Sequence, residues 1–182
     1  MALKATIFRA ELAVADMDRG HFATYTLMLA RHPSETDERM MVRLLAFALN
    51  ASEALTFGRG LSTEDEGDLM QRDLTGAIDL WIDVGLPDEK SLRKASGRAA
   101  RVVVYAYGGR AVDLWWAKNR GTVERLPNFS AFDVPLESSR SLAALAQRTM
   151  QLTCTVQDGH LWFGNATETV EVTLTVLAQQ QV

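Results

Sequence analysis

Two aspartates in an otherwise apolar segment are the residues of this sequence best suited to chemistry. The segment AIDLWIDVGLPDEK begins at residue 77 and contains Asp79 and Asp83, with Trp81 between them. If the segment is a strand, alternate residues share a face and all three side chains point the same way. A rise of about 3.3 Å per residue puts the aspartates roughly 13 Å apart, whereas a metal ion holds carboxylate oxygens at about 2.0–2.6 Å. Either one aspartate serves a site and the other is structural, or both are structural.

Asp83 is the stronger candidate because it lies near the carboxyl end of the expected strand. In open α/β sheets, ligands bind at that end. A helix is expected over 86–100, with Pro87 in its first turn, and it carries Lys90 and Lys94 one turn apart. A carboxylate that holds Mg²⁺, together with a lysine that positions water or neutralises developing charge, is the minimum set for phosphodiester chemistry.

The same expected helix carries a local cluster of positive charge. Its candidate nucleic-acid-binding residues are Lys90, Arg93, Lys94 and Arg98. The alternative interpretation is an ordinary solvated helix face. The net charge of the whole chain is −4, which argues against a protein that coats DNA without specificity. Nucleic acid therefore remains a candidate partner through this local patch alone.

A third carboxylate, Glu38, is expected near the start of another helix. In HPSETDERMMVRLLAFALNASE, Ser34 is the expected N-cap, and Asp37 and Glu38 fall in the first turn, where the helix dipole favours anions. The apolar residues that follow recur at helical spacing, and Glu38 lies on the face that they form. Glu38 either complements the helix dipole or points into a site.

Length and composition favour a single globular domain. The chain has 182 residues, 47% of them hydrophobic, which is enough to bury a core. Cys154 is the single cysteine and sits in an alternating run, so it is read as a small strand residue. The chain has no secretory signal pattern and no run of 18 apolar residues. We therefore expect a cytoplasmic protein that does not span a membrane.

The remaining elements give the expected fold class, α/β (α+β). Strands are expected over 3–15 and 21–31, and a helix is the alternative for 21–31. One or two helical turns are expected in the acidic stretch 62–73. A central strand (101–108), a helix (109–121), a strand (128–135) and a helix capped by Ser138 or Ser139 follow. An Asp-Gly hairpin and a last antiparallel strand over 167–178 end the chain. The outline is an antiparallel ribbon at each end of an alternating centre.

Several of these stretches together resemble the YaeQ family of bacterial proteins. They are MALKATI, LARHPSETDERMMVRLLAF, IDLWIDVGLPDE with the following RKA, and VQDG with LW. The resemblance covers nearly the whole chain and implies one YaeQ-like domain over residues 1–182. It also implies a compact, restriction-endonuclease-like mixed sheet flanked by helices, built around a variation of the PD-(D/E)xK nuclease motif.

The resemblance assigns roles to particular residues. Glu38 matches the acid of the core helix, and Asp83 matches the acid of the acid-x-lysine triplet. Gly85 stands where that lysine is expected, and Lys94 would replace it from the next helix. The aspartate of the preceding strand has no single match. Its candidates are Asp68 and Asp73, with Asp79 as a further carboxylate beside the site.

These roles imply a nuclease acting on DNA or RNA with Mg²⁺ or Mn²⁺. Its candidate catalytic residues are Asp83, Lys94 and Glu38, and its candidate metal ligands are Asp83, Asp79 and Glu38. The alternative function is a catalytically inactive module that binds nucleic acid or protein on the same scaffold. A third hypothesis is a regulatory protein that interacts through exposed aromatic side chains or through its β ribbons, one open edge of which would dimerise.

Overall fold

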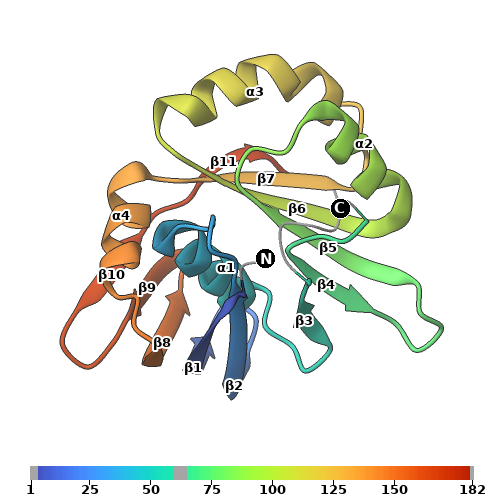
Figure 1. The fold of residues 1–182 in the computed structure, drawn as a ribbon. Coiled ribbons are helices and arrows are strands. Elements are labelled where there is room, and N and C mark those ends of the chain that lie inside the picture. Colours follow the sequence, from blue (N-terminus) through green and yellow to red (C-terminus); the bar gives the residue numbers. More distant parts are fainter. Residues whose placement is uncertain (1–3, 60–64, 181–182) are drawn as a thin grey trace. The chain divides into compact units, whose positions relative to one another are not determined.

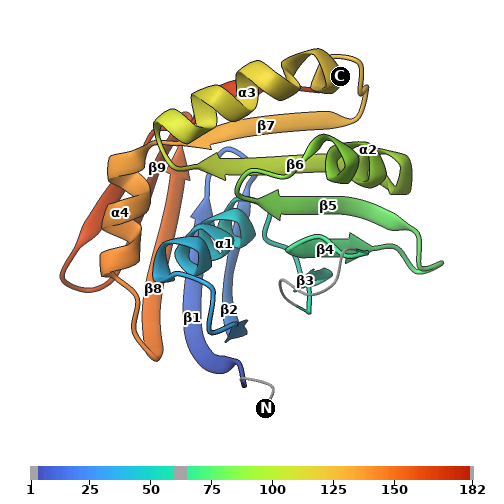
Figure 2. The same ribbon diagram turned by 45° about the horizontal axis from the view of Figure 1, so that its top comes forward.

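The fold is α+β and is built on two mixed sheets flanked by helices, as expected (Figures 1 and 2). This computed structural model describes residues 4–59 and 65–180. The chain divides into two compact units, one made of residues 1–51 and 137–173 and the other of residues 52–136 and 174–182. Each unit contains one of the two sheets, and each is described by itself below.

The first unit contains a five-stranded sheet in the order β10-β9-β8-β1-β2. Its elements are β1 (Thr6–Asp16), β2 (His21–Arg31), α1 (Asp37–Leu49), α4 (Leu136–Ala144), β8 (Thr149–Gln157), β9 (His160–Gly164) and β10 (Thr169–Val172). Strand β1 runs antiparallel to β2 and parallel to β8. The expected ribbons at both ends of the chain are confirmed, and they join into one sheet through the β1–β8 pair.

Two hairpin turns lie at one end of this sheet and are tied to each other. Asp158 and Gly159 have φ values of 51° and 76°, the left-handed conformation that a two-residue hairpin turn requires. The backbone N–H groups of both residues donate to the carboxylate of Asp18, at 2.7 and 2.9 Å. Asp18 belongs to the turn between β1 and β2, so one carboxylate fixes the ends of two hairpins. The sequence-based prediction of the Asp-Gly hairpin is confirmed.

Helix α1 begins later than expected, because Thr36 is its N-cap. The Thr36 side chain accepts a hydrogen bond from the Arg39 N–H at 3.1 Å. The Ser34 hydroxyl lies 2.6 Å from Nδ1 of His32, and this contact holds it two residues before the cap. The cap prediction at Ser34 was therefore wrong, although the first turn carries the two expected acids.

A buried ion pair anchors the start of α1. Arg43 donates to both carboxylate oxygens of Glu35, each at 2.7 Å, and to the carbonyl of Ala30 at 3.2 Å. Arg39 adds a contact of 3.0 Å to the same carboxylate. The side chains of Arg43 and Glu35 are only 4% and 2% exposed. Two opposite charges thus lie almost fully buried beside each other.

The second unit contains a six-stranded sheet in the order β11-β7-β6-β5-β4-β3. Its elements are β3 (Leu55–Phe57), β4 (Leu69–Arg72), β5 (Ile78–Val84), α2 (Glu89–Arg98), β6 (Ala99–Tyr107), α3 (Arg110–Val123), β7 (Phe129–Val134) and β11 (Thr175–Ala178). Strands β5, β6 and β7 are parallel. The β6 strand is central, as its continuous apolar run predicted.

Helices α2 and α3 cover one face of this sheet (Figures 1 and 2). Leu92 and Ala95 of α2 are fully buried against the sheet. Trp115 of α3 is 7% exposed, and its indole N–H donates to the carbonyl of Pro87 at 2.6 Å. Trp81 of β5 joins the same apolar cluster. The face of β5 that carries the two aspartates therefore faces α2 and α3.

Three further sequence-based assignments were wrong. Helical turns were expected in 62–73, but residues 69–72 form β4 because Met70 pairs with Trp81 of β5 and both side chains enter the core. Residues 62–64 of the expected helical stretch lie outside the described residues. The last strand is split into β10 and β11, which join different sheets. Helix α4 starts at Leu136, so the two serines expected to cap it lie inside it.

Candidate functional site

Asp83 occupies the carboxyl end of β5, next to the parallel strand β6. It is half-buried, and its register partner on β6 is Val104. Because side chains alternate along a strand, Asp83 shares the face of Trp81, toward α2. Carboxyl ends of parallel strands are common ligand sites, so this placement keeps Asp83 as the centre of the candidate site.

Asp68 is the carboxylate that the register brings to Asp83. Leu69 pairs with Ile82 in the antiparallel β4–β5 ladder. One further step places Asp68 opposite Asp83, and directly opposed residues share a face. The Oδ2 atom of Asp68 accepts the backbone N–H of Val84 at 2.7 Å, which fixes the orientation of this carboxylate. The sequence left Asp68 as one of two alternatives because the helical interpretation of this stretch gave it no register.

Asp73, the other alternative, lies at the opposite end of β4. Its carboxylate accepts the backbone N–H groups of Thr75 and Ala77, at 2.8 and 3.0 Å, and so closes the turn between β4 and β5. The hydrogen bond from the Thr75 side chain is the largest cause that lowers the pKa of Asp73. This carboxylate stabilises a turn, and it is not part of the candidate site.

Lys94 of α2 is paired with an aspartate that sequence reasoning missed. Its ammonium lies 2.6 Å from Oδ1 of Asp65, and the guanidinium of Arg98 lies 3.1 Å from the same oxygen. The hydrogen bond and charge of Lys94 lower the pKa of Asp65, and Arg98 adds to the effect. The only sequence signal for Asp65 was its place in an acidic stretch three residues before Asp68. The contact orders the Lys94 side chain next to the segment that leads into β4.

Two glycines shape this segment and the end of β5. A Cβ atom on Gly67 would lie 2.8 Å from the indole of Trp81 and 2.9 Å from the carbonyl oxygen of Ile82, so only glycine fits there without a shift. Gly85 has a φ of +108°, a conformation that other residues rarely adopt. Gly85 stands where the expected acid-x-lysine triplet would have its lysine. A lysine there would be strained, which gives a physical reason for its absence.

The other sequence-predicted residues take different places. Asp79 is half-buried near the amino end of β5, four residues from Asp83. Lys90 and Arg93 are exposed on α2, and Arg93 donates to Glu89 at 2.8 and 2.9 Å. Glu38 belongs to the first unit, where it accepts a hydrogen bond of 2.7 Å from the Ser139 hydroxyl. The structure thus groups Asp83, Asp68 and Lys94 within one unit and places Glu38 in the other.

Comparison with known proteins decides the family. A family model described as "YaeQ protein" matches residues 1–174. The chain belongs to the YaeQ family. Two relatives named "Uncharacterized protein YaeQ", from Escherichia coli (strain K12) and Salmonella typhi, are each 45% identical over 179 residues, with 98% of this chain and 99% of the relative covered.

Solved YaeQ structures share the fold of this chain. The crystal structure of the YaeQ protein from Xanthomonas axonopodis pv. citri matches with a TM-score of 0.91 and 49% identity, over 94% of this chain and 97% of that one. The YaeQ protein from Pseudomonas syringae matches with a TM-score of 0.92 and 35% identity, over 96% of this chain and 97% of that one. The family resemblance inferred from the sequence is confirmed.

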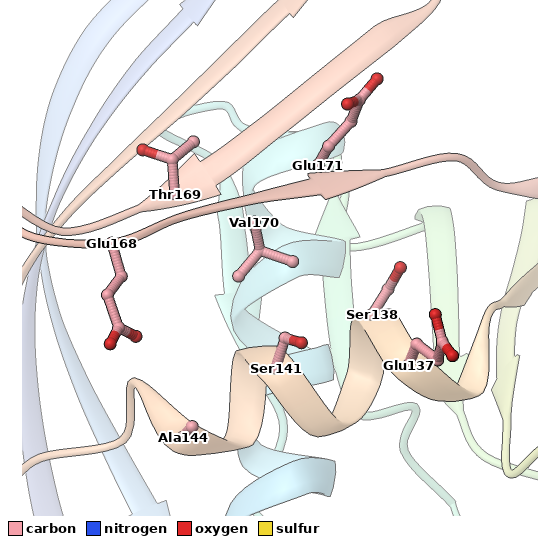
Figure 3. Close-up of a pocket in the computed structure, with 8 residues that line it drawn as sticks. All are labelled: Glu137, Ser138, Ser141, Ala144, Glu168, Thr169, Val170 and Glu171. Atoms are coloured by element: carbon pink, nitrogen blue, oxygen red, sulfur yellow. The ribbon is translucent and has the colours of Figure 1, made fainter.

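One groove in the first unit of this YaeQ-family chain is acidic. It has a volume of about 510 Å³ and lies between α4 and the edge strand β10 (Figure 3). Its lining includes three carboxylates, Glu137, Glu168 and Glu171, beside the hydroxyls of Ser138 and Ser141. Such a lining repels phosphate groups, so this groove does not suit the backbone of a nucleic acid.

Two features are absent from the part of this YaeQ-family chain that the structure describes. Among residues 4–59 and 65–180, no group of three or more His, Cys, Asp or Glu side chains is arranged to hold a metal ion. A metal site at Asp83 would therefore rest on two described carboxylates.

Among residues 4–59 and 65–180, no helix combines the length and apolar character needed to cross a membrane.

Asp133 of β7 is expected to make the stability of this chain depend on pH. Burial raises the pKa of Asp133, and the charge of Asp113 adds to the rise. The folded state therefore holds this proton to higher pH than the unfolded state, and stability is lost as pH rises through the raised pKa. We expect Asp133→Asn to raise the free energy of unfolding at neutral pH and to have little effect at acid pH. Urea titrations at both pH values measure this, and a loss of stability at neutral pH would contradict it.

Proposed function

We propose that this YaeQ-family chain is a metal-dependent nuclease in which Asp83 and Asp68 bind Mg²⁺ or Mn²⁺. The register that opposes these two carboxylates at the carboxyl end of β5 is the observation that supports the proposal. Lys94, on the following helix, supplies the positive charge. The proposal includes a restriction-endonuclease-like core in the second unit and a cytoplasmic location, where DNA and RNA are the substrates.

Two carboxylates are a fitting donor set for magnesium. Mg²⁺ keeps several of its water molecules and is usually bound through one or two carboxylates together with substrate phosphates. Asp68 is oriented by the Val84 N–H, so it does not have to be ordered when an ion binds. The bound ion would polarise a phosphoryl oxygen and lower the pKa of an attacking water.

The protein groups around the carboxylates have separate tasks in this proposal. The Lys94 ammonium neutralises charge that develops on the phosphoryl oxygens, and Asp65 holds it in place until substrate arrives. Lys90, Arg93 and Arg98 lie on the same helix and contact the sugar–phosphate backbone. Glu38 is held by Ser139 within the first unit and has no part in the proposed site.

Calorimetric titration with Mn²⁺ tests the metal site directly. We expect the wild type to bind the ion, and Asp83→Asn and Asp68→Asn to lose binding while they remain folded. Asp79→Asn is the matched control because it removes the same charge from the same face of β5. If the wild type does not bind Mn²⁺, or if Asp79→Asn loses binding as fully as Asp83→Asn, the proposed site is wrong.

A second candidate function is binding of nucleic acid without cleavage. It is favoured by the ion pair between Lys94 and Asp65, which neutralises the catalytic lysine, and by Gly85 at the motif position. This function predicts that the affinity for an oligonucleotide falls as the salt concentration rises. The affinity should also fall when Lys90 and Arg98 are both replaced by glutamate, which reverses their charges. Reversal of Arg140, an exposed residue on α4 of the first unit, is the control. Binding without turnover in the presence of Mn²⁺ would assign this second function.

A further inference from the structure

Strand β2 forms one edge of the sheet in the first unit. It is eleven residues long, His21–Arg31, and among the described strands it pairs with β1 alone. Its outer-face side chains are accessible: Phe22 is 65% exposed and Met28 is 59% exposed. Thr24 and Thr26, between them on the same face, are also exposed. The edge therefore presents a row of backbone groups beside two large apolar side chains.

This edge lacks the features with which proteins protect an open strand. Exposed edges are normally kept short, bent by a bulge, or interrupted by proline or charge. The β1–β2 register runs through eleven consecutive residue pairs without a shift. Between His21 and Arg31 the sequence FATYTLMLA contains no charged residue and no proline. An edge of this length and composition is expected to be covered by another strand.

We propose that the edge of β2 pairs antiparallel with β2 of a second copy of this chain. With Tyr25 on the two-fold axis, Phe22 stands opposite Met28 of the second copy, and Thr24 stands opposite Thr26. Each pair occurs twice by symmetry, and all these residues project from the same outer face. A methionine sulfur against an aromatic ring is a favourable contact, and opposed threonines suit a strand pair.

The charges of the strand fit a second copy. Residues 22–28, which form the pairs about Tyr25, include no charged residue. Two chains that each carry a net charge of −4 therefore meet along an uncharged strand interface. The nearest charged neighbours on β1 are Arg9, beside Met28, and Glu11, beside Thr26. Across the interface, Arg9 is in line with Ala15 of the other copy and Glu11 is in line with Ala13 of the other copy. No like charges therefore oppose each other. A two-fold pairing of this kind also closes and does not propagate.

Mass measurement over a range of concentrations tests the pairing. We expect sedimentation equilibrium to show conversion from 20.1 kDa to twice that mass as concentration rises. Thr26→Lys places two lysines diagonally across the axis and should weaken association by roughly tenfold or more. Thr153→Lys adds the same charge to an exposed position of β8, inside the sheet, and should have little effect. A single 20.1 kDa species at every concentration, or equal effects of the two variants, would overturn the proposal.

Disulfide formation tests the register even if a lysine variant fails to fold. Thr24→Cys and Thr26→Cys proteins, mixed in equal amounts, should cross-link under mild oxidation, because residues 24 and 26 are directly opposed. Each variant alone should cross-link far less, since equivalent residues lie about 7–8 Å apart on the diagonal. Cys154 does not interfere, because burial raises the pKa of its thiol to about 12. Equal cross-linking of mixed and separate proteins contradicts the register. Cross-links to another protein, with a monomeric chain, would assign the edge to a different partner and overturn pairing between copies.

Discussion

Glu35→Gln is expected to lower the free energy of unfolding by about 3–5 kcal/mol, the usual cost of breaking a buried ion pair from one side. The substitution keeps the shape of the side chain and removes its charge. The Arg43 guanidinium, 4% exposed and bonded to both carboxylate oxygens, would then be a buried cation without its counter-charge. Urea unfolding followed by circular dichroism measures the loss.

Two further variants separate the buried charge from the rest of the contact. Arg39→Met removes a partner of Glu35 that is 17% exposed, and it should cost distinctly less. The double variant Glu35→Leu/Arg43→Met replaces both charges by apolar groups of similar size, and such replacements are often neutral or stabilising. A loss of under about 1 kcal/mol in Glu35→Gln would show that water or neighbouring groups already compensate the arginine.

Asp83→Asn is expected to reduce metal-dependent cleavage of nucleic acid by at least about 10²–10³-fold, the size of effect seen when one electrostatic group is removed from an active site. Lys94→Met should fall in the same range, because it removes the charge that stabilises the phosphoryl oxygens. Both expectations rest on the nuclease proposal. End-labelled DNA and RNA oligonucleotides, with and without Mg²⁺ or Mn²⁺, give the rates.

Matched substitutions show whether a loss is specific. Arg140→Met removes an exposed cation from α4 of the first unit, and Asp79→Asn removes a carboxylate from the same strand face as Asp83. Each should change the rate by no more than a few fold. Cleavage that persists without a metal ion, or that survives in the double variant Asp83→Asn/Lys94→Met, contradicts the nuclease. Metal binding without any cleavage assigns the binding function.

The regular elements could be predicted where local patterns decide the structure. The Asp158-Gly159 hairpin and the buried β6 strand follow from turn chemistry and an apolar run, and both are confirmed. The assignments that failed depend on distant partners. Residues 69–72 follow a run of acidic residues that favours a helical interpretation, and they form a strand because Met70 and Trp81 share a core. The Thr36 cap was missed for a local reason, since Ser34 and Thr36 are both good caps.

The candidate site could be predicted only in part. Asp83 was recognised because a carboxylate near the end of an apolar strand is unusual. Asp68 became its partner only when the β4–β5 register was known, because register is a property of two strands. Lys94 lies on a helix and Asp65 on an irregular segment, and the two residues are 29 positions apart in the sequence, so no local pattern indicates their contact. The Glu35–Arg43 pair was missed because burial of a charge leaves no local trace in a sequence.

The parallel pairing of β1 with β8 has a consequence for how the chain acquires its structure. Arg9 pairs with Thr149, so the sheet of the first unit joins segments separated by well over a hundred residues. During synthesis β1 and β2 leave the ribosome well before β8, so their sheet lacks β8 until well over a hundred further residues have been made. Closing so large a loop is slow, because its entropy is lost before any contact forms. A β1–β2 hairpin that forms early therefore has no strand beside β1 until β8 has emerged.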